Sequence, residues 1–119
     1  MSTRCTTHFQ SYGRTEAIIY RHTDGYPEGA GKDIAKFLVK CKQLPDSRLT
    51  DPSYLAAKYV VFLASMFSRD YKTNHFRNKL DFISVGVVSS DPEDIEYRYT
   101  VNCDEMNDGL PVVTCEHVQ

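Results

Sequence analysis

The segment from residue 50 to residue 67 constrains the fold more than any other part of the sequence. It opens with Asp51-Pro52, which is typical of a helix start because aspartate caps the first turn and proline suits the first helical position. Apolar side chains then continue through Phe67 on more than one side of the helical wheel. This pattern predicts a central, deeply buried helix from Pro52 to Phe67, which the rest of the chain must cover.

A second helix and several strands are predicted around it. From Lys32 to Lys42 one apolar stripe follows helical spacing, and Pro45 ends the element. Between Ile95 and Cys103 apolar and polar residues alternate strictly, which indicates a strand with one face toward the helices. The predicted strands cover residues 3–10, 15–22, 82–88, 95–103 and 111–117, with turns at 11–14, 91–94 and 107–109.

This order of elements predicts one α+β domain spanning residues 1–119. The simplest arrangement that buries every apolar face is a single antiparallel sheet of about five strands, in the order β-β-α-α-β-β-β, with both helices packed on one face. A length of 119 residues suits a single domain, and we see no repeat or linker.

The sequence also bears on compartment and redox state. No apolar stretch is long enough to span a membrane, and the first residues lack the apolar run of a secretory signal, so we expect a cytoplasmic protein with no membrane partner. Reduced thiols are expected there, buried as small hydrophobes. The four cysteines are Cys5, Cys41, Cys103 and Cys115. Cys103 and Cys115 are expected to face each other across a hairpin, which allows a disulfide without implying one.

Charge is divided unevenly along the chain. Residues 32–80 carry ten Lys/Arg and four Asp/Glu, whereas residues 91–119 carry one arginine and eight acidic residues. The two halves could attract each other or present different faces to partners. A net charge of −2 and a pI near 6.0 argue against a general nucleic-acid binder, although they leave room for a local basic patch.

The most chemically dense segment runs from Arg21 to Glu28. His22 and Asp24 would point to the same side of an extended strand, so the carboxylate could orient the imidazole for acid–base catalysis. Glu28 could add a third oxygen donor for a metal, and Arg21 and Tyr26 complete the candidate binding residues. The alternative is structural: Asp24 caps its own turn and His22 bonds a neighbouring carbonyl. No cofactor, and no helical histidine pair of the zinc-binding kind, is predicted.

The glycine-rich end of this segment resembles a phosphate-binding loop only superficially. Tyr26 stands where that loop needs its first glycine, and Asp33 follows Lys32 where a hydroxyl is required. Gly29 and Gly31 could still offer backbone N–H groups to an anion near a helix start. The alternative is that both glycines adopt positive φ in a tight connection.

The basic segment 69–79 interleaves cations with aromatic residues, a pattern that can hold single-stranded nucleic acid. Its cations include Lys72, Arg77 and Lys79, and its aromatic residues are Tyr71, His75 and Phe76. The alternative is a solvated loop whose aromatic side chains pack back onto the core. His8, His75 and His117 are expected to be surface histidines.

Two stretches carry a resemblance to known proteins. Met1-Ser2-Thr3-Arg4 and the ten residues from Tyr20 to Gly29, in the pattern Tyr-Arg-His-x-Asp-Gly-Tyr-Pro-Glu-Gly, resemble a family of small bacterial and phage proteins of unassigned activity. The chain departs from that pattern at Thr23, where the family carries tryptophan. The resemblance implies a bacterial, phage or prophage setting and supplies no activity, cofactor or catalytic residue.

Three functions remain open from the sequence. The leading hypothesis is a binding or regulatory module acting through contacts with another protein, because charge is polarised and no complete catalytic motif is present. The second is a small enzyme or metal-binding domain built on residues 21–28, and the third is a nucleic-acid contact through residues 69–79. Activity, partner identity and homo-oligomer formation are not determined by the sequence.

Overall fold

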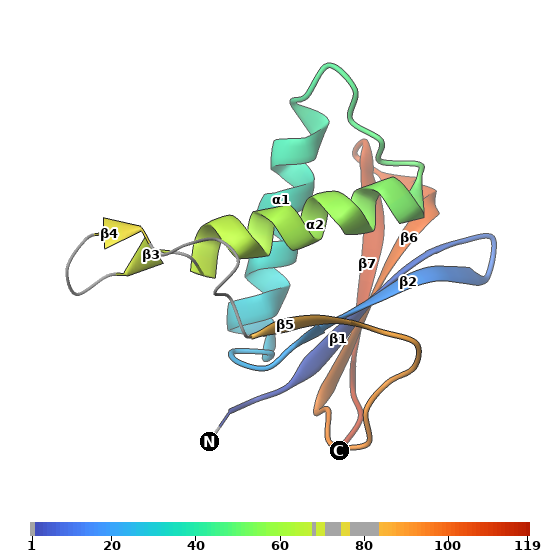
Figure 1. Ribbon diagram of the computed structural model, residues 1–119. Coiled ribbons are helices and arrows are strands. Elements are labelled where there is room, and N and C mark those ends of the chain that lie inside the picture. Colours follow the sequence, from blue (N-terminus) through green and yellow to red (C-terminus); the bar gives the residue numbers. More distant parts are fainter. Residues whose placement is uncertain (1, 68, 71–74, 77–83) are drawn as a thin grey trace.

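The computed structural model describes residues 2–67, 69–70, 75–76 and 84–119. Two helices lie beside one five-stranded sheet (Figure 1), so the α+β class with two helices on one face is confirmed. The elements in chain order are β1 (Cys5–Ser11), β2 (Arg14–Arg21), the π-helical turn η1 (Pro27–Gly31), α1 (Lys32–Lys42), α2 (Pro52–Phe67), β3 (Arg69–Asp70), β4 (His75–Phe76), β5 (Val85–Val88), β6 (Tyr97–Asn107) and β7 (Leu110–His117).

The sheet is mixed, not antiparallel throughout as the sequence led us to expect. Its strand order is β5-β2-β1-β6-β7, and β1 runs parallel to β6 whereas the other three ladders are antiparallel. The predicted hairpin between the strands on either side of residues 91–94 is therefore wrong. That segment instead connects the edge strand β5 to β6 across two intervening strands, so that β6 pairs with β1 and β7.

The core lies between the sheet and the two helices. Phe9 of β1 and Phe37 of α1 both pack against Tyr59 of α2, with ring centroids 5.6 and 5.1 Å apart. On β6 the predicted alternation holds, since Tyr99, Val101 and Cys103 are all buried. The apolar residues of the alternating pattern thus form the face of β6 that packs in the core.

Helix α2 is less enclosed than its composition predicts. Leu55, Tyr59 and Leu63 are fully buried, yet Tyr54 and Val61 on its outer side are 53% and 63% exposed. The prediction of a central, deeply buried helix therefore holds only for the sides of α2 that face the sheet and α1. An apolar strip therefore remains uncovered.

The cysteines differ from expectation at one position. Cys5, Cys41 and Cys103 are buried as predicted, but Cys115 is exposed on the edge strand β7, and all four are free. Cys115 lies opposite Tyr99 in the β6–β7 register and not opposite Cys103. The expectation that the two cysteines face each other across the hairpin is therefore wrong.

Candidate functional site

Arg21, a predicted binding residue, is built into the core. Its side chain is 4% exposed, and its guanidinium Nη1 donates to Asp33 Oδ2 at 2.7 Å. Its Nε donates to the Thr23 carbonyl at 2.7 Å, and the guanidinium lies 5.1 Å from the ring centroid of Phe67. Arg21 thereby joins the end of β2 to the first turn of α1 and to the end of α2.

His22 has separate partners. The Tyr20 hydroxyl donates to His22 Nδ1 at 2.8 Å, and Arg4 Nε donates to the same nitrogen at 3.3 Å. Because an arginine Nε can only donate, His22 Nδ1 is the acceptor in the contact with Arg4. Arg4 also pairs with Asp94 at 3.2 Å, so His22 belongs to a surface network that includes no bond to Asp24.

Asp24, Tyr26 and Glu28 lie at the exposed outside of the loop. Asp24 adopts a positive φ of 55°, and its Oδ1 accepts a hydrogen bond from the Tyr26 hydroxyl at 3.1 Å. Positive φ therefore falls on Asp24, and the expectation that Gly29 and Gly31 supply it is wrong.

The glycines of the loop are required for close packing. A Cβ on Gly25 would lie 2.8 Å from the Thr3 carbonyl oxygen, and one on Gly29 would meet the Asp24 carbonyl oxygen. The buried hydroxyl of Tyr99 donates to the Gly25 carbonyl at 2.7 Å. These contacts hold the loop tightly against the N-terminal segment and β6.

The predicted site residues are thus not brought to one point: Arg21 turns into the core, His22 joins Tyr20, and Asp24 bonds Tyr26. In the described part of the chain no group of three or more His, Cys, Asp or Glu is placed to hold a metal ion. Most of the predicted basic segment 69–79 lies outside the described residues. Within it the structure describes only the short strands β3 and β4.

A polar cluster that sequence reasoning missed lies on the sheet face opposite the helices. Asp91, in the segment between β5 and β6, accepts hydrogen bonds from Thr6 Oγ1 (2.7 Å), His8 Nε2 (2.7 Å) and Arg98 Nε (2.6 Å). Arg98 also contacts Glu116 at 3.3 Å. His8 is therefore not the surface histidine that was expected, since its side chain is only 16% exposed. The available signal was that Thr6, His8 and Arg98 share the non-core phase of their strands.

This cluster holds Asp91 in its ionised form. Burial by itself raises the pKa of Asp91, but the hydrogen bonds from Thr6, His8 and Arg98 outweigh it and bring that pKa below its ordinary value. Both carboxylate oxygens accept hydrogen bonds from side chains of β1 and β6. The cluster therefore holds Asp91, and with it the segment between β5 and β6, against the sheet.

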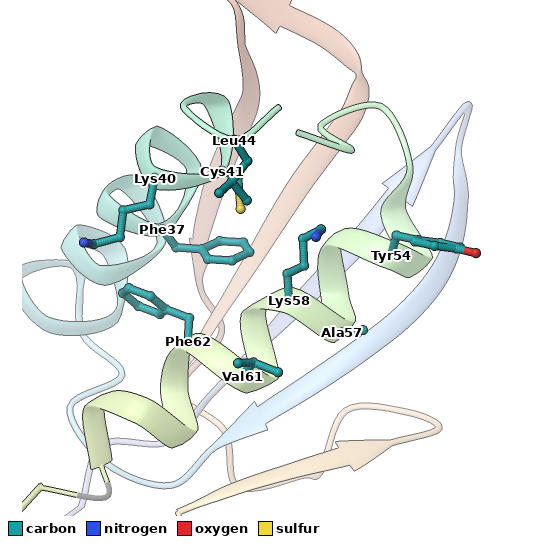
Figure 2. Close-up of a pocket in the computed structure, with 9 residues that line it drawn as sticks. All are labelled: Phe37, Lys40, Cys41, Leu44, Tyr54, Ala57, Lys58, Val61 and Phe62. Atoms are coloured by element: carbon teal, nitrogen blue, oxygen red, sulfur yellow. The ribbon is translucent and has the colours of Figure 1, made fainter. Parts of the chain in front are cut away.

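An apolar hollow on the described surface lies between α1 and α2 (Figure 2). It encloses about 560 Å³, within the range usual for ligand pockets. Its walls are mainly apolar: Phe37, Cys41 and Leu44 from the α1 side, and Tyr54, Ala57, Val61 and Phe62 from α2. Leu44, Tyr54 and Val61 are 47%, 53% and 63% exposed, so water covers apolar surface that the fold leaves unpacked.

Two lysines accompany this hollow, here named the α1–α2 groove. Lys58 rises from α2 into the space between the helices, whereas Lys40 extends from α1 away from it (Figure 2). Lys58 is half-buried and Lys40 exposed. Among the described residues neither ammonium has a carboxylate partner.

No described helix combines the length and apolarity needed to cross a membrane. A scan against protein-family models, a search of curated proteins and a search of solved structures each found no match.

Proposed function

We propose that the chain is a binding module that acts through contacts with another protein, and that the α1–α2 groove is where a short apolar segment of that protein docks. The observation that carries the proposal is the groove itself: an apolar hollow with exposed Leu44, Tyr54 and Val61 beside uncompensated lysines. Exposed apolar residues scattered singly need no explanation, but a contiguous hollow of them is typical of interaction sites.

The placement of the predicted catalytic residues favours binding over the enzyme hypothesis. His22 and Asp24 bond to different partners, and Arg21 forms an internal ion pair with Asp33. On this proposal the segment 21–28 has a structural role, as the connection between β2 and α1. The bacterial or phage setting implied by the resemblance, a homo-oligomeric state and the nucleic-acid contact through residues 69–79 stay predictions.

The test is a selection from a displayed library of random twelve-residue peptides against the immobilised full chain. Val61→Glu places a carboxylate in the groove wall at an exposed helical position, so the fold should tolerate it. Val39→Glu is the matched control, because Val39 is an exposed valine of α1 that does not line the groove. Peptides enriched on the wild type should lose binding to Val61→Glu and keep it with Val39→Glu.

The proposal is refuted if no peptide is enriched above the level of an unrelated protein, or if the enriched peptides bind Val61→Glu as well as wild type. Backbone amide chemical shifts give a second readout. On titration with an enriched peptide, the largest changes should fall in the two helices and not on the β5 or β7 edge. Circular dichroism melts of both variants establish that each is folded.

A further inference from the structure

Among the lysines and arginines whose side chains the structure describes, Lys58 alone is both half-buried and without a carboxylate at ion-pair distance. The other described lysines also lack such a partner, but they are exposed. The described arginines Arg4, Arg14, Arg21, Arg48 and Arg98 each have a carboxylate within ion-pair distance. Lys58 has none among the described residues, yet it is half-buried between apolar walls. A charge that is partly dehydrated and unpaired gains more from an incoming anion than a fully solvated one does.

The position of the Lys58 ammonium is defined by what surrounds it. Figure 2 shows the side chain rising between the helices, with Leu44 and Tyr54 toward one end of the groove and Val61 and Phe62 toward the other. Cys41 and Lys58 both line the groove. Burial raises the pKa of the Cys41 thiol, and the charge of Lys58 acts in the opposite direction. The charge thus sits inside the hollow, with apolar surface on both sides.

We infer that Lys58 selects the partner by pairing with a carboxylate that lies between two bulky apolar side chains of the docking segment. This inference rests on the proposed function, since it names the chemistry of the segment that the α1–α2 groove accepts. The apolar walls of the groove contact the two flanking side chains of the docking segment, and the Lys58 ammonium pairs with the carboxylate between them.

The spacing along α2 gives the pattern of the segment. Tyr54, Lys58 and Val61 are separated by four and three residues, so one stripe of the helix presents apolar, cationic and apolar surface over roughly 10 Å. A helical segment matches that span with an apolar residue at i, Asp or Glu at i+3 or i+4, and an apolar residue at i+7. We expect this pattern among groove-dependent peptides.

The decisive experiment compares an enriched peptide with its own Glu→Gln version, by fluorescence anisotropy, against three full-length proteins. Against wild type, the glutamine peptide should bind roughly tenfold more weakly, as for a close and partly desolvated charge pair. Against Lys58→Gln the two peptides should differ by less than about twofold. Lys40→Gln is the matched control: its ammonium points away from the groove, so the discrimination should persist.

Failure of this inference is distinguishable from failure of the proposed function. Groove-dependent peptides without an acidic residue, or equal discrimination by Lys58→Gln and wild type, would overturn the role of Lys58 and leave the groove as a docking site. Absence of any groove-dependent peptide would remove both.

Two other occupants are also outcomes of the test. Laurate, a free apolar carboxylate, offers the same combination of apolar surface and negative charge, so it is titrated alongside the peptides. Laurate binding that is lost in Val61→Glu while no peptide binds would overturn a protein partner. Concentration-dependent dimerisation lost in Val61→Glu, measured by sedimentation, would assign the groove to a second copy and overturn it equally.

Discussion

Replacing Asp91 with alanine is expected to destabilise the fold by about 3 kcal/mol. The carboxylate accepts three hydrogen bonds, from Thr6, His8 and Arg98, at 2.6 to 2.7 Å, and its side chain is 17% exposed. Thr6 is fully buried, so its hydroxyl would be left without an acceptor at a cost of about 1–3 kcal/mol. Arg98 keeps Glu116 as a partner and loses less.

The predicted loss is large relative to the total stability of a domain, which is about 5–15 kcal/mol. Urea unfolding followed by circular dichroism measures it directly, and the melting temperature should fall by roughly 10 °C. Asp91→Asn should lose less, because one amide oxygen still accepts. Asp94→Ala is the matched control: Asp94 lies in the same segment with a side chain 60% exposed, so its ion pair with Arg4 should contribute at most about 1 kcal/mol.

The pH dependence follows from the direction of the pKa of Asp91. That pKa is lower in the folded than in the unfolded chain, so the unfolded chain binds the proton more readily. The stabilisation is therefore complete above the unfolded value of about 4 and is lost as the pH falls through the folded one. Wild type and Asp91→Ala should converge in stability at acidic pH. A difference below about 0.5 kcal/mol at pH 7, or one that grows on acidification, would refute the reasoning.

The remaining predictions concern the loop and the thiols. Tyr99→Phe removes the buried donor to the Gly25 carbonyl and should lower the free energy of unfolding by about 1–2 kcal/mol; an unchanged urea midpoint would contradict this. Gly25→Ala should destabilise strongly because its Cβ would meet the N-terminal backbone, whereas Gly86→Ala, with nothing within 4 Å, should leave the melting temperature nearly unchanged. In the native protein Cys115 should react with a thiol reagent in seconds to minutes, while Cys5, whose pKa burial raises to about 12, should react only on unfolding; simultaneous reaction would contradict the buried placement.

Local physical chemistry made much of the fold predictable from the sequence. The start of α2 follows from Asp51-Pro52, since Asp51 Oδ1 accepts from the Tyr54 backbone N–H at 3.3 Å. The turn before β7 follows from Asp108-Gly109, which adopt φ of 54° and 78° as such a pair commonly does. The buried phase of β6 follows from strict alternation. Each of these signals involves residues close together in the chain.

The candidate sites show where such reasoning ends. Asp91 lies more than 80 residues from Thr6 and His8 in sequence, so no local spacing could predict that the sheet would bring them together. The α1–α2 groove likewise depends on which flank of α2 the shorter helix leaves uncovered. Conversely, the polar segment 21–28 was the most conspicuous in the sequence, but its side chains do not converge on one site. Arg21 turns inward to pair with Asp33, and Tyr99 binds the loop backbone at Gly25.

The sequence by itself determined the two helices, the five strands of the main sheet and the side of β6 that meets the helices, because propensity, capping and periodicity are properties of neighbouring residues. It did not predict η1 or the short strands β3 and β4. Only the tertiary structure decided that β6 runs parallel to β1, that Asp91 bonds to the outer face of the sheet, and that Lys58 lies in an apolar groove with no carboxylate partner among the described residues. These features arise from contacts between distant segments, whose free energy depends on how the whole chain packs.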